Sequence, residues 1–437
     1  MFATSTWAAD SSGKWSLKDC IDYAMANNIT LKKSGLTKQS SGEDLKQAQA
    51  ALFPSLSVST SHSVGYRPWI NQGTATVSNG TVATGVDKTY YSGSYGVNAN
   101  WTVWNGNKNR NNIKLDNLAV KQAELDSLTS ANSIQEQIVQ LYVQILYTNE
   151  AINVNKESYE ISKKNEERGR EMVEVGKLAK ADLAQLTAQT AQDKYSIVEA
   201  EANLAKYKLQ LKQLLEITND QPFDVAVPAK AESQALEDIP SLMSVYEVAL
   251  ANRPEIANGK LAIQSSDLSI QIAKAGKMPT ISITGGVGTS TTSMSDRTWG
   301  KQFKTNFDAS AGVSVSLPLF DNRSTKTSVN KAKIQREQSV LDLQDKQKQL
   351  YSTIEGYWQD AYTNQEKFRA ATASVESAEA SYELLSEQFR LGLKNIVELM
   401  TGKTNLLTAQ QNKLQSKYMT ILDRQLLKFY KGEAMDM

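Results

Sequence analysis

Histidine and cysteine carry much of the chemistry of enzymes and metal sites, and this chain has one of each. A Ser-His or Cys-His nucleophile would have to use His62 as its base. Cys20 lies in an amphipathic helical pattern, where we expect a small buried residue. His/Cys metal sites need three or four such ligands and are excluded. Because no phosphate-binding loop is present either, the sequence predicts neither an enzyme nor a cofactor.

The surroundings of His62 form an alternating pattern rather than a catalytic motif. The stretch "PSLSVSTSHSVGY" (54–66) has serine at every second position, with mostly apolar side chains between. Stretches at 91–103, 280–288 and 303–320 alternate in the same way. An alternation of period two predicts β-strands whose two faces differ in polarity.

These strands are almost free of charge, although the whole chain is 22% charged. Transmembrane β-strands alternate in this way, with lipid on one side and water on the other. A sheet of a soluble sandwich also alternates, but its solvated face usually carries Lys, Glu and Thr. Aromatic residues near the strand ends fit the girdles of a membrane interface: Tyr66, Trp69, Tyr90, Tyr91, Trp101, Trp104 and Trp299. We therefore interpret the strands as transmembrane and expect a set of polar residues to face a water-filled lumen: Ser55, Ser57, Ser59, Ser61, Asn98, Asn100, Ser314 and Ser316.

Four strands are too few to close a barrel, because the smallest bacterial barrels have eight. An open sheet edge in hydrocarbon would leave backbone groups unpaired at several kcal/mol each. The chain must therefore pool its strands with other copies of itself. Two copies would give eight strands, three would give twelve and four would give sixteen.

The chain also repeats itself. One offset, of 225 positions, relates Ala24, Asn27 and Pro54 to Ala249, Asn252 and Pro279. A second offset, of 216 positions, relates later pairs: Trp104 with Phe320, Gly176 with Gly392, and Leu183 with Leu399. Fold repeats show this self-similarity at fixed spacing. We predict a first repeat over 1–216, a linker over 217–242 and a second repeat over 243–437.

Each predicted repeat is a helix–β-hairpin–helix unit. The first has a helix at 17–53, strands at 54–66 and 89–104, a long helix at 105–175 and a helix at 177–215. The second has a helix at 243–278, strands at 279–293 and 303–320, a long helix at 321–391 and a helix at 393–430. A heptad seam marks both long helices: Ile134, Ile138, Leu141, Ile145 and Ile152, repeated as Leu350, Ile354, Tyr357, Ala361 and Phe368. Such a helix would measure about 105 Å, far beyond a globular domain.

Composition limits the partners and the location. Lys and Arg (48) balance Asp and Glu (47), so nothing indicates nucleic acid. The sequence contains no run of 18 apolar residues, so it predicts no transmembrane helix. The start "MFATSTWAAD" lacks the basic region and apolar core of a signal peptide. We expect either a cytosolic protein or one whose export signal is missing from this chain.

Several motifs carry a likeness to a known family. The second repeat contains "ANRPEI", "MPTISI", "SLPLFDNR" and "RLGLKNIVELM", and the first contains "NWTVWNGNKNR" and "VGKLAKADLAQL". In their order, spacing and duplication these motifs resemble the TolC-like outer-membrane efflux family, over about residues 15 to 430.

The resemblance implies an α+β membrane protein that forms a homotrimer. Its members combine a twelve-stranded transmembrane β-barrel in the outer membrane of Gram-negative bacteria with a twelve-helix coiled-coil tunnel through the periplasm. They are exit ducts of tripartite efflux or type I secretion systems, with a periplasmic adaptor and an inner-membrane transporter as partners. The duct hydrolyses nothing, needs no cofactor and contacts outer-membrane lipid.

The resemblance also implies a gate at the periplasmic tip, just after the turn glycines Gly176 and Gly392. Glu398 stands where the family usually has a pore-facing aspartate, and Lys394 stands where some members have a tethering arginine. A second acidic ring would need an acid at Thr401, which this chain lacks. The equivalent of Glu398 in the first repeat is Asp182.

Glu398 has a second reading that does not involve the pore. Asn395 and Glu398 have the spacing of a helix N-cap with an acid at the third helical position. Capping and pore-facing roles are compatible, so both stay open.

Other functions are weighed against the exit duct. A porin that works without a pump would not need two helices of about 105 Å each. A periplasmic coiled-coil adaptor or a helical pore-forming toxin would leave the alternating strands unexplained.

Overall fold

A computed structural model describes residues 14–69, 73–77, 80–84, 87–218, 223–228 and 231–437. The chain forms two compact units. The helical unit comprises residues 1–38, 123–260 and 341–437, and the sheet unit comprises residues 39–122 and 261–340. Each unit takes segments from both predicted repeats, so the two copies interleave.

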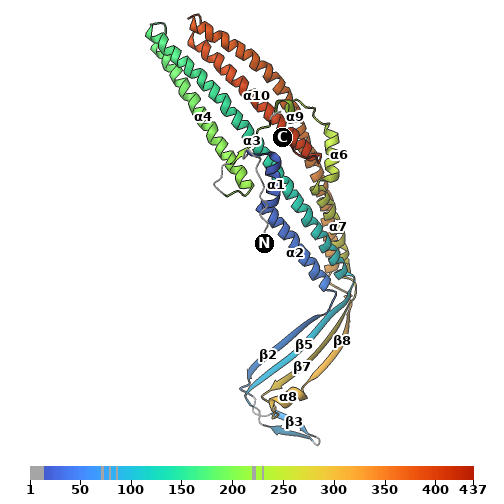
Figure 1. Cartoon of the computed structure of the whole chain (residues 1–437). Helices are drawn as coiled ribbons and strands as arrows, with labels where there is room; N and C mark the ends of the chain where they lie inside the picture. Colours follow the sequence, from blue (N-terminus) through green and yellow to red (C-terminus); the bar gives the residue numbers. More distant parts are fainter. Residues whose placement is uncertain (1–13, 70–72, 78–79, 85–86, 219–222, 229–230) are drawn as a thin grey trace. The chain divides into compact units, whose positions relative to one another are not determined.

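The main helices confirm the duplication. In the first copy they are α1 (Leu17–Asn27), α2 (Ile29–Ala50), α3 (Lys108–Glu174) and α4 (Lys180–Leu214). In the second copy they are α6 (Leu242–Asn252), α7 (Pro254–Ala275), α9 (Ser324–Arg390) and α10 (Ile396–Tyr430) (Figure 1). The lengths are 11, 22, 67 and 35 residues in both copies. None of the helices in the described part of the chain combines the length and the apolar character that crossing a bilayer requires.

The predicted single helices at 17–53 and 243–278 are each two helices, because one residue leaves the helical conformation. Asn28 has φ −58° and ψ 129°, and its Oδ1 accepts a hydrogen bond from the backbone N–H of Thr30 at 2.8 Å. Arg253 takes nearly the same backbone angles. It precedes Pro254, whose ring disfavours the helical conformation in the residue before it. Both copies therefore break at the corresponding position.

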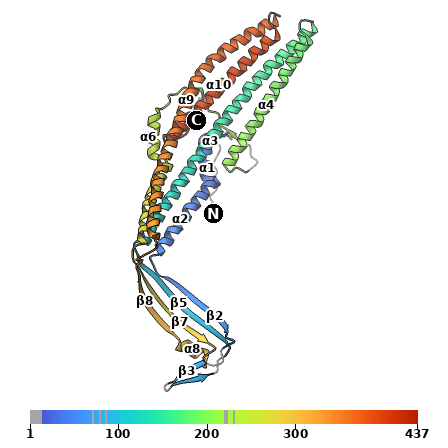
Figure 2. The ribbon, with the colours of Figure 1, turned by 180° about the vertical axis from the view of Figure 1, so that it is seen from behind.

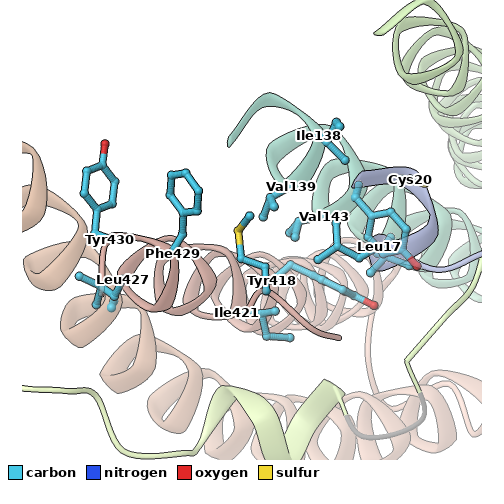
Figure 3. Close-up of a cluster of buried hydrophobic side chains, with 14 of the residues drawn as sticks. Leu17, Cys20, Ile138, Val139, Val143, Tyr418, Ile421, Leu427, Phe429 and Tyr430 are labelled. Atoms are coloured by element: carbon cyan, nitrogen blue, oxygen red, sulfur yellow. The ribbon is translucent and has the colours of Figure 1, made fainter. Parts of the chain in front are cut away.

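The core of the helical unit includes the predicted heptad seams. Figure 3 shows part of this core, with Ile138 of the α3 seam. Four of the five seam positions in each long helix are buried, and the third position of each is partly buried: Leu141 in α3 and Tyr357 in α9. Cys20 is fully buried in the same cluster, as predicted, and burial raises the pKa of its thiol to about 12. Packing of α3 and α9 therefore stabilises this unit, with helices from both copies contributing.

The sheet unit contains a four-stranded antiparallel sheet in the order β2-β5-β7-β8 (Figures 1 and 2). Its strands are β2 (Ser55–Tyr66), β5 (Thr89–Asn105), β7 (Thr280–Thr292) and β8 (Asp308–Ser316). A separate hairpin pairs β3 (Gly73–Val77) with β4 (Gly80–Thr84). In the helical unit β1 (Lys14–Trp15) pairs with β6 (Asp224–Val225), and α5 (Ala231–Ala235) follows.

The strand predicted at 303–320 is wrong at both ends. Residues Trp299–Thr305 form the short helix α8, and β8 covers only Asp308–Ser316. Past Gly288, β7 has no β8 residue opposite it, and α8 packs there instead. The side-chain amide of Gln302 accepts from the Thr292 N–H (2.7 Å) and donates to the Thr292 carbonyl (3.0 Å). A helix side chain thus replaces a strand partner.

Candidate functional site

The first candidate site is the polar face of the four-stranded sheet. Directly opposite residues of antiparallel strands share a face. The register pairs Ser55 with Asn100, Asn100 with Thr284, and Thr284 with Gly312. It therefore brings all the polar positions predicted from the sequence onto one face: Ser55, Ser57, Ser59, Ser61, Asn98, Asn100, Ser314 and Ser316. Hydroxyl pairs such as Ser61 with Ser94 (2.7 Å) bond across it.

The opposite face is apolar over four rows of residues. Val58 pairs with Val97, which pairs with Val287. Nearer the helices, Trp101 pairs with Ile283. A bulge between Thr102 and Trp104 puts Trp104 opposite Ile281, so both tryptophans share this face. Simple alternation would have placed Trp104 on the polar face, and the sequence pattern does not reveal the bulge.

Both faces of this sheet are exposed in the single chain. The side chains of Leu56, Val58 and Val313 are 74%, 80% and 70% exposed. The serines of β2 on the other face are also exposed. A soluble sandwich would bury one face against a second sheet. The apolar face therefore needs a non-aqueous environment, which the hydrocarbon of a bilayer supplies.

Aromatic residues bound the apolar face at both ends. Trp101 and Trp104 lie at the helix end, and Tyr91 lies ten positions from Trp101 along β5. Ten residues extend about 33 Å along a strand. At the usual barrel tilt of about 40° this spans about 25 Å, the height of a transmembrane apolar band. Tyr90, predicted as a girdle residue, instead shares the polar face with Gly65.

The second candidate site is the helix tips, where two glycines form identical turns. Gly176 and Gly392 both have φ +74°, a region that favours glycine. After each glycine the next N–H donates to a carbonyl five residues back, from Lys177 to Met172 (2.7 Å) and from Leu393 to Gln388 (2.9 Å). This is the Schellman ending of a helix.

Glu398 caps α10 at the tip of the second copy. Its N–H donates to Oδ1 of Asn395 (3.0 Å), and its carboxylate accepts from the Asn395 N–H (3.3 Å). The ammonium of Lys394 donates to the same carboxylate. This hydrogen bond, with that from Asn395, holds the pKa of Glu398 below its ordinary value. The capping reading is therefore correct, and the pore-facing role stays a prediction.

The other two gate candidates have different surroundings. Asp182 holds the third position of α4, as Glu398 does in α10, but the N-cap there is Ala179, whose side chain accepts no hydrogen bond. The hydroxyl of Thr401 donates to the Val397 carbonyl of its own helix (2.8 Å). Only the second copy therefore joins a cap, an acid and a lysine at one tip.

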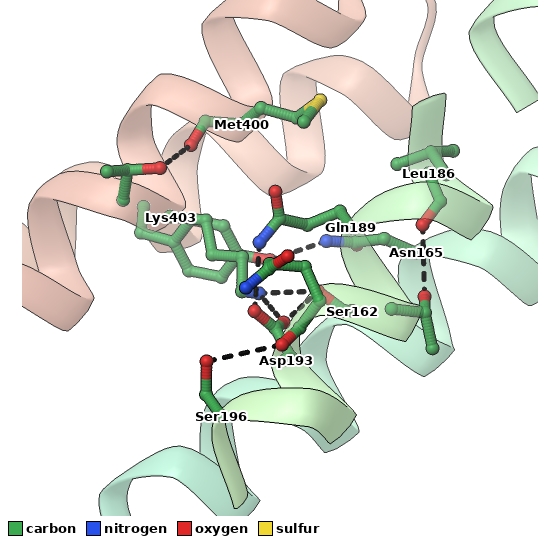
Figure 4. A network of polar contacts seen from close by, with 12 residues as sticks. Ser162, Asn165, Leu186, Gln189, Asp193, Ser196, Met400 and Lys403 are labelled. Carbon is green, nitrogen blue, oxygen red and sulfur yellow. Dashed lines mark hydrogen bonds and ion pairs between the residues drawn. The ribbon is translucent and has the colours of Figure 1, made fainter. Parts of the chain in front are cut away.

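The structure contains a buried ion pair below the tips that the sequence pattern did not predict (Figure 4). Lys403 of α10 pairs with Asp193 of α4, and both side chains are nearly inaccessible, at 5% and 6% exposure. Ser162 of α3 accepts from Lys403 (2.5 Å) and donates to Asp193 (2.6 Å). Burial lowers the pKa of Lys403, while Asp193 opposes that shift.

The sequence does contain a signal for this pair. Positions 396, 399, 403 and 406 follow one another at spacings of 3, 4 and 3, as in a helical seam. Ile396, Leu399 and Leu406 are apolar, and Lys403 is the polar residue among them. These apolar residues pack with Leu186, Tyr382 and Phe389 in a second cluster of the helical unit. The pair therefore lies within the packing of α4 against α9 and α10.

Within the described residues, His, Cys, Asp and Glu form no group of three that could hold a metal ion. The polar groups line a sheet and neutralise one another at helix ends and helix contacts.

Comparison with known proteins identifies the family. The model of the outer membrane efflux protein family matches residues 20–216 and 245–433. The outer membrane efflux protein BepC of Brucella suis is 22% identical over 354 residues, 81% of this chain and 74% of BepC. The probable efflux pump outer membrane protein TtgC of Pseudomonas putida is 24% identical over 60% of this chain, a match that spans 51% of TtgC.

Among solved structures, CusC has a TM-score of 0.81 and 16% identity, and the alignment covers 98% of this chain and 96% of that one. The chain belongs to the outer membrane efflux protein family, as the motifs predict. It is a TolC-like exit duct of the Gram-negative outer membrane, in a family of channel proteins.

Proposed function

We propose that three copies of the chain close a twelve-stranded barrel and a twelve-helix periplasmic tunnel. Within the described part of the single chain β2 and β8 are the outer strands of the sheet, and each has a strand neighbour on one side only. Unpaired backbone groups in hydrocarbon cost several kcal/mol each, which favours pairing of β8 with β2 of the next copy. Three copies of four strands give the twelve that the family resemblance implies.

The exposed two-faced sheet is the observation that carries this proposal. Its apolar face would contact outer-membrane lipid, and its hydroxyl and amide face would line the lumen. A wall of Ser, Asn and Gly binds no solute strongly, so the lumen would pass small toxic compounds or other cargo. Selectivity would come from the transporter that loads the duct.

At the periplasmic tip we assign the gate to the Glu398 and Lys394 pair, with Asp182 as the acid of the first copy. Three Glu398 carboxylates in a narrowing tunnel would concentrate cations, and Lys394 would offset part of their charge. With Thr401 in place of a second acid, we expect a weaker constriction than two acidic rings would give.

For partners we propose a periplasmic adaptor and an inner-membrane transporter. The names of BepC and TtgC place those relatives in efflux, and TtgC in an efflux pump. The near-zero net charge favours no nucleic-acid partner. The duct itself would hydrolyse nothing, so that the energy would come from the transporter.

Crosslinking in the native membrane tests this function. The chain, purified under denaturing conditions after crosslinking, should bring down an adaptor and an inner-membrane transporter. Planar bilayers should show low resting conductance for the purified protein. A wide, permanently open pore with no such partners would instead indicate a porin that works without a pump.

A further inference from the structure

The short helix α8 carries two faces of opposite character. On a helix of about 3.6 residues per turn, Trp299, Gln302 and Phe303 share one side, while Lys301 and Lys304 lie on the other. Gln302 is 2% exposed and bonds the end of β7, so its side faces the sheet. The two lysines therefore point away from the sheet.

The side of the sheet that α8 covers is the apolar one. The ring centre of Phe303 lies 4.8 Å from that of Tyr95, and Trp299 stacks on Tyr91 at 6.0 Å. Tyr95 pairs with Thr60 and Thr289, the row after the one that contains Val58 and Val97. Thr289 in turn donates to the Phe303 carbonyl (2.9 Å). The helix is thus fastened between the last apolar row, at Val97, and Tyr91, the aromatic residue that ends the apolar band.

Chain order gives the side of the membrane on which α8 lies. β5 runs directly into α3, and α7 runs directly into β7, so one end of the sheet joins the long helices. The α8 segment connects β7 to β8 at the opposite end. With the helices in the periplasm, α8 lies at the outer leaflet.

The lysines of α8 are free to bind an external anion. Lys301 and Lys304 are exposed, and within the described residues neither ammonium group forms an ion pair or hydrogen bond. Aromatic side chains at the interface beside unpaired cations provide both an apolar and an electrostatic contact for a lipid.

We propose that α8 binds the phosphate groups of anionic outer-leaflet lipids through Lys301 and Lys304. This inference rests on the proposed function, because it takes the apolar face as the lipid side. Trp299 and Phe303 lie at the level where acyl chains begin, and the ammonium groups reach the headgroups. The helix then closes the end of β7 and anchors the barrel to its surrounding lipid.

The test measures lipid retention by native mass spectrometry of the detergent-purified protein. Phosphorylated lipid A is the probe, and phosphatidylethanolamine is the zwitterionic comparison. The double variant Lys301→Gln/Lys304→Gln should bind lipid A on the order of tenfold more weakly than the parent. The matched control Lys346→Gln/Lys348→Gln removes two exposed lysines of α9 and should bind like the parent.

Equal lipid A retention by the two double variants would overturn the proposal. So would a parent that retains lipid A no better than phosphatidylethanolamine. Displacement of lipid A by equimolar inorganic phosphate would point to a phosphate-ion site rather than a lipid site, and would also overturn it. The oligomer mass in the same spectra shows that each variant is folded.

Conductance separates this inference from the proposed function. If the parent forms channels in planar bilayers but the lipid A measurements contradict the expectation, only the proposal of a headgroup site on α8 is overturned. If the parent forms no channel and does not insert, the proposed function itself fails.

Discussion

Lys394 and Glu398 form an ion pair on the carboxylate that caps α10, so the proposed gate charge is partly neutralised within its own tip. Replacing Glu398 with Gln removes the negative charge and leaves Lys394 unopposed. We expect cation selectivity in planar bilayers to fall and block by trivalent cations to weaken. Asp182→Asn, which changes the equivalent acid of the uncapped copy, is the matched comparison. Unchanged selectivity in Glu398→Gln would reduce Glu398 to a capping residue.

Lys394→Ala should act in the opposite direction. It uncovers the Glu398 carboxylate, so cation selectivity should rise, and repulsion between the uncovered carboxylates of the three copies should raise the resting conductance. Single-channel recording of the variant beside the parent measures both quantities. A fall in cation selectivity would contradict the assignment of Lys394 as the countercharge.

The same pair predicts a pH dependence. The pKa of Glu398 is held below its ordinary 4.5, mainly by Lys394. The negative charge of this carboxylate, and its contribution to cation selectivity, is therefore complete above pH 4.5 and is lost as pH falls through the lowered pKa. In Lys394→Ala the loss of cation selectivity should begin at a higher pH than in the parent. Coinciding titration curves would show that Lys394 does not set this pKa.

The faces of the sheet give a paired test. Val97 lies in a row of valines on the apolar face, so Val97→Arg should cost about 2–4 kcal/mol at the middle of the bilayer and reduce insertion. Ser59→Arg lies on the polar face and should insert normally while it changes conductance. The amount of folded oligomer in outer-membrane fractions checks both. Similar insertion defects in the two variants would count against the assigned faces.

The buried pair of Lys403 and Asp193 should matter more for stability than the exposed tip pair. Lys403→Met leaves a buried carboxylate without its partner and should lower the free energy of unfolding by about 3 kcal/mol. The double variant Lys403→Met/Asp193→Leu removes both charges and should recover most of that loss. Denaturant unfolding in detergent measures the cycle. A double variant as unstable as the single one would show that packing, not charge, is at fault.

Sequence pattern predicts the features that repeat. The duplication predicts helices of equal length in the two copies, because the offsets of 225 and 216 each stay constant between the shared motifs. The faces of the strands follow from alternation, and Gly176 and Gly392 mark the tip turns because a φ of +74° strongly favours glycine.

Features that depend on one local or long-range contact are not readable from pattern. Asn28 breaks a helix through its own side chain, which donates to the Leu214 carbonyl at 2.9 Å. Gln302 turns a predicted strand into α8 by bonding the backbone of Thr292, ten residues away. Lys403 and Asp193 are 210 positions apart and meet only when the two copies pack.

The central claim is that three copies of this chain close one barrel around a shared lumen. Native mass spectrometry of the detergent-purified protein tests it most directly. Three chains of 48.2 kDa should appear as a single stable species of about three times that mass. A stable monomer, or a dimer or tetramer as the main species, would contradict the account.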